Sequence, residues 1–462
     1  MTTFQDLDIE SSLKKAILEK GYTTLTPIQE RAIPVALNGS DVLAIAQTGT
    51  GKTAAFCIPT LNKLIQMDEK PRPNHPQALI LTPTRELAIQ IQENLIAYGK
   101  NQKQHYLCVY GGVPQRNQVK GLNRGVNIVV ATPGRLLDLI SQRKLKLSDV
   151  SVFILDETDR MLDMGFMKDL KRILPLLPEE RQTLFFSATM PSDIHRLASN
   201  ILTDPKKIEI APESTTVATI EQAVVHVEKK EKISLLLHYL KDPSFKKVLV
   251  FVDMKHVANK LVERLQDNQI PSVAIHGNKT QGARQKAIAS FKKSRTQVMV
   301  ATDVAARGID IDDITHVINY DLPSDPESYV HRIGRTGRAG KKGIAISMVA
   351  AEDKLNLIKT EKKIQQALPL DSNQPFHDPS VADAPVTAKK RGGGGFRGRG
   401  NGGSSRGGGS NSRFSRSGGG GSGQRRGRSS NSSSRSQSDR KTSRGPAGPK
   451  KGYRVQGKKA AK

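Results

Sequence analysis

The chain has 462 residues and a strongly uneven distribution of charge. Its formal net charge is +28, yet residues 389–462 alone hold 21 Lys and Arg against one acidic residue. The preceding 388 residues carry a net charge of only +8. A basic segment of this strength favours polyanionic partners, nucleic acid first and an anionic membrane second.

Several protein classes are excluded by simple features of the sequence. No apolar run approaches the ~20 residues that a membrane-spanning helix needs, and the first residues do not resemble a secretory signal. Cys57 and Cys108 are the two cysteines of the chain, too few for a disulfide framework or a four-cysteine zinc site. We therefore expect a protein of the reducing cytoplasm without a membrane span.

Short apolar runs recur through the first 205 residues, each followed by polar residues and then by a helical pattern. They lie at residues 42–45, 78–81, 128–130, 152–155 and 183–186. Continuous rather than alternating apolar runs are typical of strands that are covered on both faces, and hence of parallel sheets. Residues 1–205 are thus predicted to form a doubly wound α/β domain.

The same pattern returns in the second half, at residues 248–252, 273–275, 298–300, 317–318 and 344–346. It predicts a second α/β domain over residues 220–370, with an interdomain linker at 206–219. From residue 371 the composition loses core-forming side chains, and from Arg391 it is mainly Gly, Ser and Arg. Because such a segment cannot bury enough apolar surface to offset chain entropy, residues 371–462 are predicted to be a disordered, basic, RGG-like tail.

Residues 46–53 form a candidate phosphate-binding loop between a predicted strand and a predicted helix. They read Ala-Gln-Thr-Gly-Thr-Gly-Lys-Thr, which is the P-loop pattern with Ala at its first glycine position. Gly49 and Gly51 would let backbone amides curl round phosphate oxygens. Lys52 would add a positive charge and the Thr53 hydroxyl a ligand for Mg²⁺.

Two further clusters complete a nucleotide-hydrolysing site. The apolar run 152–155 leads directly into Asp156 and Glu157, which predicts Asp156 as a Mg²⁺ carboxylate and Glu157 as the base that polarises the attacking water. Residues 331–338 hold a dense basic cluster in which Arg335 and Arg338 are three positions apart. We expect these two arginines to stabilise the charge that develops on the transferred phosphoryl group.

The full set of motifs resembles the DEAD-box ATP-dependent RNA helicases of superfamily 2, most closely their bacterial RhlE-like branch. The resemblance covers residues 1–370 in the family's order: a Q motif (Gly21-Tyr22 and 26–29, with Phe4 upstream), motif I (46–53), RNA-contacting segments (83–87, Gly111-Gly112, 132–135), motif II (156–159), motif III (187–189), motif IV (250–252), the segment with Gln281 and Arg284, motif V (301–310) and motif VI (331–338). It implies two tandem RecA-like domains that bind ATP, Mg²⁺ and RNA in the cleft between them.

The resemblance also implies roles for individual residues, motif by motif. ATP contacts fall on Phe4, Gln29, Gln47, Thr48, Gly49, Thr50, Gly51, Lys52, Thr53 and Asp310, with Thr53 and Asp156 as Mg²⁺ ligands. Catalysis falls on Lys52, Asp156, Glu157, Arg335 and Arg338. RNA contacts fall on Arg85, Gly112, Gly134, Arg135, Arg284, Thr302 and Asp303. Coupling between the two sites falls on Asp159, Ser187, Thr189 and His331.

Two positions depart from the family pattern. Thr158 stands where motif II has Ala, and Leu25 stands where the Q motif usually has Pro. Leu25 loses one fixed φ angle, but Gln29 still offers its amide to adenine. We expect Thr158 to affect the fit beside motif III more than phosphate chemistry, so that Thr158→Ala changes ATP turnover by no more than a few-fold.

The predicted activity is local separation of RNA duplexes, or remodelling of RNA–protein complexes, coupled to ATP hydrolysis. RNA would be held through phosphates and 2′-hydroxyls with little base reading. Ribosomal precursor particles and the RNA-decay machinery are candidate partners. A DNA-translocating helicase, and an RNA chaperone that anneals strands through its tail, are the alternative interpretations.

The tail generates a prediction of its own. Deleting residues 389–462 removes a charge of +20, so RNA affinity should fall and its salt dependence should weaken. ATPase activity at saturating RNA should stay largely intact, since the predicted catalytic residues lie elsewhere. Filter binding across a salt series measures the first effect, and an RNA affinity that does not change would contradict a tethering role.

Overall fold

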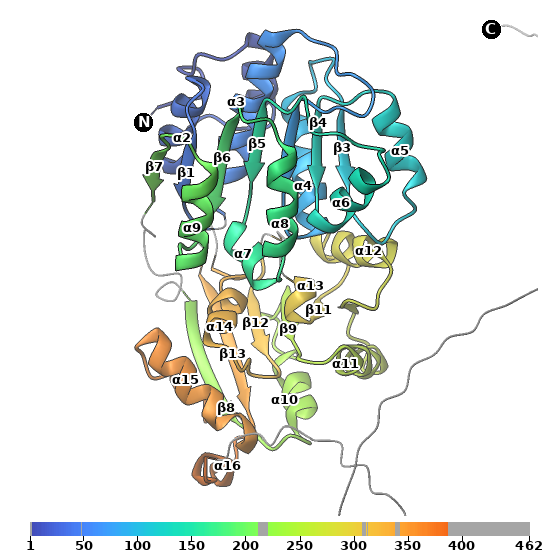
Figure 1. Ribbon diagram of the computed structural model, residues 1–462. Helices are drawn as coiled ribbons and strands as arrows, with labels where there is room; N and C mark the ends of the chain where they lie inside the picture. The colour runs from blue at the N-terminus through green and yellow to red at the C-terminus, as the bar shows by residue number, and fades with distance from the viewer. Residues whose placement is uncertain are drawn as a thin grey trace, which may run out of the picture. The chain divides into compact units, whose positions relative to one another are not determined.

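The computed structural model describes residues 2–47, 49–210, 220–306, 311, 313–337 and 342–386. Within these ranges the chain forms two α/β domains, each built on one parallel sheet (Figure 1). Both parallel sheets that the apolar runs predicted are therefore present. The basic tail from residue 387 onward lies outside the described residues.

The first domain contains a seven-stranded sheet with the order β3-β4-β2-β5-β6-β1-β7. Its strands are β1 (Val42–Ile45), β2 (Ala78–Leu81), β3 (Tyr106–Val109), β4 (Ile128–Ala131), β5 (Val152–Leu155), β6 (Gln182–Ser187) and β7 (Lys206–Glu209). All neighbouring pairs are parallel. Strands β2, β4, β5 and β6 are buried along their whole length, as the continuous apolar runs require.

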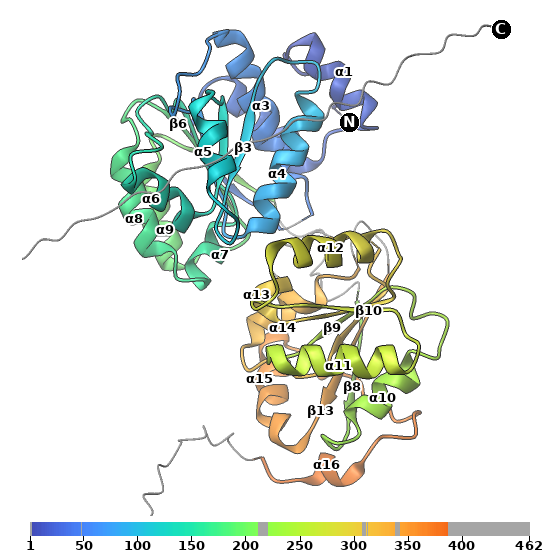
Figure 2. The ribbon, with the colours of Figure 1, turned by 90° about the vertical axis from the view of Figure 1, so that its right-hand side faces the viewer.

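Helices cover both faces of this sheet. They are α1 (Ser11–Glu19), α2 (Pro27–Leu37), α3 (Lys52–Met67), α4 (Arg85–Tyr98), α5 (Arg116–Asn123), α6 (Pro133–Ser141), α7 (Thr158–Asp163), α8 (Met167–Ile173), the 3₁₀ turn η1 (Leu174–Leu176) and α9 (Ser192–Ile201). Figure 2 shows α3 and α4 on one side of the sheet and α6, α8 and α9 on the other. Two apolar cores result, one on each face.

The second domain repeats this plan with a six-stranded parallel sheet of order β10-β11-β9-β12-β13-β8. Its strands are β8 (Ile220–His226), β9 (Val248–Phe251), β10 (Ser272–Ile275), β11 (Val298–Ala301), β12 (His316–Asn319) and β13 (Gly343–Val349). Its helices are α10 (Lys232–Tyr239), α11 (Lys255–Asp267), α12 (Gln281–Lys292), α13 (Asp303–Ala306), α14 (Pro326–Ile333), η2 (Ala351–Asp353), α15 (Lys354–Ile364) and α16 (Pro379–Asp383). Across the described residues, no helix has the length and apolar character to cross a membrane.

The first domain extends further than the predicted boundary at residue 205. Residues 206–209, predicted as linker, form β7, which pairs in parallel with β1. Three of its four side chains are charged, and Ile208 alone is buried, because an edge strand packs only one narrow face. Because the strand is mostly charged, its sequence looks like that of a linker, and this is why it was predicted as one. Residues 211–219 lie outside the described residues.

The prediction that the tail begins at residue 371 is also wrong, because residues 371–386 pack against the second domain. The Tyr239 hydroxyl donates to Asp371 at 2.6 Å, and the Asp378 amide donates to the His226 carbonyl at 2.8 Å. Phe376 packs against the core over α10 and α11, and Val381 is buried in α16. A few well-placed apolar side chains were enough to order a segment of otherwise polar composition.

This packing predicts a measurable contribution to stability. Phe376→Ala should lower the free energy of unfolding of the second domain by about 1–3 kcal/mol, below the cost at a fully buried phenylalanine because Phe376 is only partly buried. Val386→Ala is the matched control: Val386 is 49% exposed, so its truncation should change stability by less than about 0.5 kcal/mol. Denaturant unfolding of the full chain measures both, and equal effects would contradict docking of the segment.

Candidate nucleotide and RNA site

The functional turns of the first domain follow three neighbouring strands. The phosphate-binding loop follows β1, the Asp156 turn follows β5 and the Ser187–Thr189 turn follows β6, and these strands are adjacent in the order β5-β6-β1. Because parallel strands end at the same edge of a sheet, the three turns lie together there. The sheet topology thus brings residues that are 140 positions apart in sequence into one site.

The phosphate-binding loop has the backbone that its glycines predict. Gly49 and Gly51 have φ values of 89° and 94°, which side-chain-bearing residues rarely adopt, and Gly51 precedes the first turn of α3. Lys52 is buried, and its ammonium group donates to the Ala46 carbonyl at 2.8 Å. The Thr50 hydroxyl donates to the Gln47 carbonyl at 2.8 Å. Thr48 lies outside the described residues.

The predicted adenine-recognising residues lie beside this loop. The Gln29 side chain accepts from the Thr26 amide at 3.0 Å and donates to the Gly51 carbonyl at 3.1 Å. It therefore joins the start of α2 to the start of α3. Phe4 is 2% exposed and stacks under Tyr22, with ring centroids 6.2 Å apart. Phe4 thus supports Tyr22, which is the more exposed of the two rings.

The turn after β5, which holds the predicted catalytic residues Asp156 and Glu157, buries both carboxylates. Burial raises the pKa of Asp156 to about 7, although the nearby Lys52 charge opposes this shift. Glu157 is in the left-handed region with φ 53° and ψ 50°, and Arg160 forms a buried ion pair with it. A buried carboxylate, a threonine hydroxyl at Thr53 and phosphate oxygens are the hard donors that Mg²⁺ prefers, so the residues present fit this ion.

Asp159 links the turns after β5 and β6. Its carboxylate accepts from the amides of Ala188 at 3.2 Å and Thr189 at 2.9 Å, and from the Thr189 hydroxyl at 3.0 Å. The Asp159 amide donates to the Ser187 hydroxyl at 3.3 Å. The contact expected from Ser187 and Thr189 to Asp159 is therefore present, while their role in coupling stays a prediction.

Two of the predicted RNA-contacting residues of the first domain lie against each other. Arg85 begins α4, and a Cβ atom added to Gly112 would lie 2.1 Å from its guanidinium group. Gly112 also has a φ of 81°, which favours glycine at this position. A side chain there would in addition displace the flexible end of Arg85. At Gly134, by contrast, an added Cβ would meet open space.

Arg135 supports the loop that carries Gly112. Its guanidinium donates to the Val113 carbonyl at 3.3 Å and to the Gln118 side chain at 3.3 Å, and it pairs with Asp138 at 3.4 Å. These contacts hold the start of α6 against the loop after β3. The donors of Arg135 are thus engaged by the protein's own loop.

Arg284, another predicted RNA contact, is paired with an acidic residue that the motif comparison did not single out. Its guanidinium lies 3.1 Å from the Glu86 carboxylate, and the Gln281 amide donates to Glu86 at 3.0 Å. Arg85 also donates to Gln281 at 3.4 Å. The sequence contained a signal for this acid, since Glu86 directly follows Arg85 within the matched segment 83–87.

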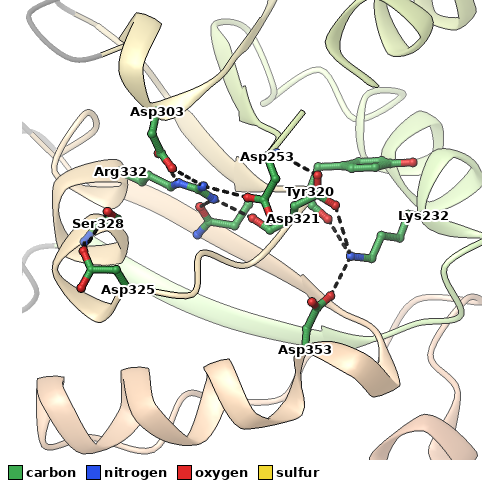
Figure 3. Close-up of polar contacts among 10 residues, drawn as sticks. Lys232, Asp253, Asp303, Tyr320, Asp321, Asp325, Ser328, Arg332 and Asp353 are labelled. Carbon is green, nitrogen blue, oxygen red and sulfur yellow. Dashed lines mark hydrogen bonds and ion pairs between the residues drawn. The ribbon is translucent and has the colours of Figure 1, made fainter. Parts of the chain in front are cut away.

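Asp303 and Thr302 were predicted to contact RNA, and Asp303 has a strong partner inside its own domain. Arg332 holds the Asp303 carboxylate through two hydrogen bonds of 2.6 and 2.7 Å (Figure 3). Arg332 is 1% exposed, so a bidentate carboxylate is the acceptor that such a buried guanidinium needs. Thr302 precedes α13, and its carbonyl accepts from Ala305 and Ala306.

Arg332 belongs to a larger polar network across the ends of the second sheet. It donates to the Asp321 carbonyl at 2.6 Å and lies 3.4 Å from Asp253. Lys232, itself 2% exposed, contacts Asp353 at 3.2 Å and Asp321 at 3.9 Å (Figure 3). The network fixes β11, β12 and α14 relative to one another. Sequence reasoning missed Arg332, although it lies within the matched cluster 331–338.

The predicted transition-state arginine Arg335 lies just after α14. It is 8% exposed, and its Nε donates to the His331 carbonyl at 3.2 Å. His331 and Arg335 line one pocket of the second domain together with Asp303. Arg338 and Asp310 lie outside the described residues.

Comparison with protein families gives two matches in sequence order. The DEAD/DEAH box helicase family matches residues 26–197, and the helicase conserved C-terminal domain matches residues 231–340. The DEAD-box ATP-dependent RNA helicase RhpA of Helicobacter pylori is 42% identical over 395 residues, covering 83% of this chain and 79% of its own. The chain belongs to the DEAD-box ATP-dependent RNA helicase family.

Other relatives and solved structures support the same family assignment. CshA of Bacillus subtilis, also a DEAD-box ATP-dependent RNA helicase, is 43% identical over 366 residues, covering 79% of this chain and 73% of its own. A structure of S. cerevisiae Dbp5 bound to RNA and ADP BeF3 matches with a TM-score of 0.70 at 31% identity, covering 80% of this chain and 95% of Dbp5. A structure of Mss116p bound to ssRNA and AMP-PNP matches with a TM-score of 0.70 at 28% identity, covering 83% of this chain and 82% of the Mss116p chain.

These matches confirm the predicted family, the RecA-like fold and the activity of an RNA helicase that uses ATP. They do not favour the alternative of a chaperone that acts through its tail. The assignment to the RhlE-like branch stays a prediction, as do the roles of the individual site residues.

The Asp303–Arg332 pair of the helicase predicts a stability effect. Asp303→Asn removes the charge that compensates a buried guanidinium, so the free energy of unfolding of the second domain should fall by about 2–4 kcal/mol. The control is Glu327→Gln, which removes an ion pair between two exposed side chains, those of Glu327 (64% exposed) and Lys363 (52% exposed). This substitution should lower the free energy of unfolding by less than about 1 kcal/mol. Denaturant unfolding compares the two; a neutral Asp303→Asn would show that Arg332 does not depend on this carboxylate.

Proposed function

We propose that this helicase hydrolyses Mg²⁺-bound ATP at the edge of the first sheet and uses the cycle to separate short RNA duplexes locally or to remodel RNA–protein complexes. Lys52 and Thr53 bind the phosphates and their metal, and Asp156 holds the metal. Glu157 orients and deprotonates the attacking water. Arg335 and Arg338 of the second domain stabilise the charge on the transferred phosphoryl group.

The observation that carries this proposal is the adjacency of the turns after β5, β6 and β1. It places Asp156 and Glu157 beside the loop of Lys52, the arrangement that in-line attack on a terminal phosphate requires. Mg²⁺ would neutralise phosphate charge and polarise the reacting phosphoryl group. Burial of Asp156 favours a bound cation beside it, because an isolated buried carboxylate is costly.

Binding of ATP would rearrange contacts that the protein makes with itself. The Lys52 ammonium would exchange the Ala46 carbonyl for phosphate oxygens, which offer a stronger, charge-assisted bond. Glu157 would divide its carboxylate between Arg160 and water. The Arg160 pair keeps the carboxylate of the base aligned through a charge-assisted hydrogen bond.

RNA binding would use the predicted contacts on both domains, chiefly Arg85 and Gly112 of the first and Arg284 and Thr302 of the second. Because the nucleotide and RNA sites draw on both domains, ATP favours the arrangement in which both sites are complete. Asp159, held by the turn after β6, connects the two sites within the first domain. Ribosomal precursors and RNA-decay machinery are the cytoplasmic assemblies on which such an activity would act.

A comparison of ATPase stimulation by RNA and by DNA of the same sequence distinguishes this function from that of a DNA-translocating helicase. The proposed contacts to 2′-hydroxyls let a protein distinguish the two polymers. ATPase stimulation by RNA with little stimulation by DNA supports the proposal. Equal stimulation by the two would contradict it.

Glu157→Gln tests the catalytic role directly. The amide cannot accept the proton of the attacking water, so RNA-stimulated phosphate release should fall at least about a hundredfold. ATP binding, followed with a fluorescent nucleotide, should persist because Lys52 and Asp156 remain. Duplex separation should fall with phosphate release, and duplex separation that survives would show that hydrolysis does not drive it. Glu180→Gln, at an exposed loop position, is the charge-matched control and should retain activity.

A further inference from the structure

Thr158, the residue that departs from the family's motif II, makes a specific contact inside the catalytic turn. Its side chain is fully buried, with 0% exposure. Its hydroxyl donates to the Phe186 carbonyl of β6 at 3.1 Å. Alanine, which the family has at this position, offers no such donor. The contact is therefore a property of this chain's sequence.

The backbone around Thr158 explains why a donor is needed there. The Asp156 amide donates to the Leu81 carbonyl of β2, so the next amide along the chain, that of Glu157, faces the opposite neighbour β6. The Glu157 amide does not continue this ladder. It donates to the Asp156 side chain at 3.0 Å, as the chain turns into the left-handed conformation of Glu157.

The Thr158 hydroxyl takes the place of that backbone amide on the β6 side. A buried carbonyl requires a hydrogen-bond donor, and Thr158 supplies one to Phe186 one residue after the ladder ends. The residue thereby ties the first turn of α7 to the end of β6. Its neighbours on both sides in sequence are Glu157 and Asp159, the base and the link to the turn after β6.

We propose that Thr158 is a positioning residue, which through its hydroxyl holds Glu157 in its left-handed conformation and keeps Asp159 in register with the Ala188–Thr189 turn. The proposal rests on the proposed function, since it assigns Glu157 the role of the base. Thr158 does not touch ATP or water. It acts on hydrolysis by limiting the positions that Glu157 and Asp159 can occupy.

Three substitutions separate the hydrogen bond from mere packing. Thr158→Ser keeps the hydroxyl and loses one methyl group. Thr158→Ala loses both but leaves space in which a water molecule can bind the Phe186 carbonyl. Thr158→Val fills the original volume with no donor and excludes water. A positioning hydrogen bond therefore predicts activity in the order Thr, Ser, Ala, Val, whereas a packing role predicts that Val resembles Thr most closely.

The first measurement is RNA-stimulated ATPase of the full chain at saturating RNA. Thr158→Val should lower kcat about three- to tenfold, the effect expected when one buried hydrogen bond no longer contributes. KM for ATP should change less than twofold, because the phosphate and metal contacts remain. Thr158→Ser should restore kcat to within about twofold of the unchanged protein. A Val variant with unchanged kcat, or Ser less active than Val, overturns the proposal.

A control removes another buried threonine hydroxyl by the same substitution elsewhere in the first domain. Thr60 is 1% exposed, and its hydroxyl donates to the Phe56 carbonyl at 2.7 Å within α3. Thr60→Val deletes that bond without touching the catalytic turn. The Phe56 carbonyl keeps its backbone partner within α3, so Thr60→Val should change the melting temperature less than Thr158→Val does and should leave kcat unchanged. An equal loss of kcat in both variants would show a general stability effect and overturn the proposal.

A second measurement does not depend on enzymatic activity. The amides of Ala188 and Thr189 donate to Asp159, so hydrogen exchange at these amides reports whether Asp159 is in register. In the nucleotide-free protein, Thr158→Val should speed their exchange at least about threefold, while Thr60→Val should not. Unchanged exchange in Thr158→Val overturns the positioning role even if the chain hydrolyses ATP. Loss of RNA-stimulated ATPase in the unsubstituted chain contradicts the proposed function instead.

Discussion

One carboxylate, that of Asp159, joins the two turns at the centre of the proposed site, because it accepts three hydrogen bonds from the residues after β6. Strands β5 and β6 are neighbours and end at the same edge of the first sheet. The Asp159 carboxylate is the hydrogen-bond acceptor for the Ala188 and Thr189 amides at this edge. The Asp159 carboxylate therefore ties the turn after β5 to the turn after β6.

In the second domain a buried cation has the corresponding role. Arg332 is held by Asp303, by the Asp321 carbonyl and by Asp253. A guanidinium can be buried to this extent only if its donors are satisfied. Asp303, expected from the family pattern to contact RNA, thus orients the cluster that carries Arg335. A carboxylate next to RNA would be repelled by phosphate, and its pairing with Arg332 reduces that repulsion.

The sequence predicted the architecture well where one signal dominates. Continuous apolar runs identified the strands that are buried on both faces, and glycines identified the left-handed turn at Gly51. The edge strands β3, β7 and β8 were missed, whereas the edge strand β10 was predicted. Strand β3 begins with the half-buried Tyr106, and β7 buries only Ile208, so neither has a continuous apolar run. The segment 371–386 was missed because its order depends on Tyr239 and His226, which lie more than 130 positions earlier in the chain.

The site residues were identified by type and position but not by partner. The motif patterns do not indicate that Glu86 binds Arg284 or that the Thr158 hydroxyl reaches Phe186, and Arg160 was not predicted as the partner of Glu157. Such partners depend on how distant segments pack together and on how the first turn of a helix is oriented. Motif patterns do not encode either of these. The family pattern supplied predicted roles for these residues, and the structure supplied their contacts.

These contacts have a consequence for the energetics of the cycle. Lys52 is bonded to Ala46, Glu157 to Arg160 and Arg335 to His331. These three charged groups therefore already have partners inside their own domains. A ligand replaces existing hydrogen bonds rather than satisfying bare charges, so each exchange alone contributes little free energy. Several exchanges must occur together to favour the ligand-bound arrangement. The predicted ATP and RNA contacts both draw on the two domains, so binding of both ligands can supply these exchanges together.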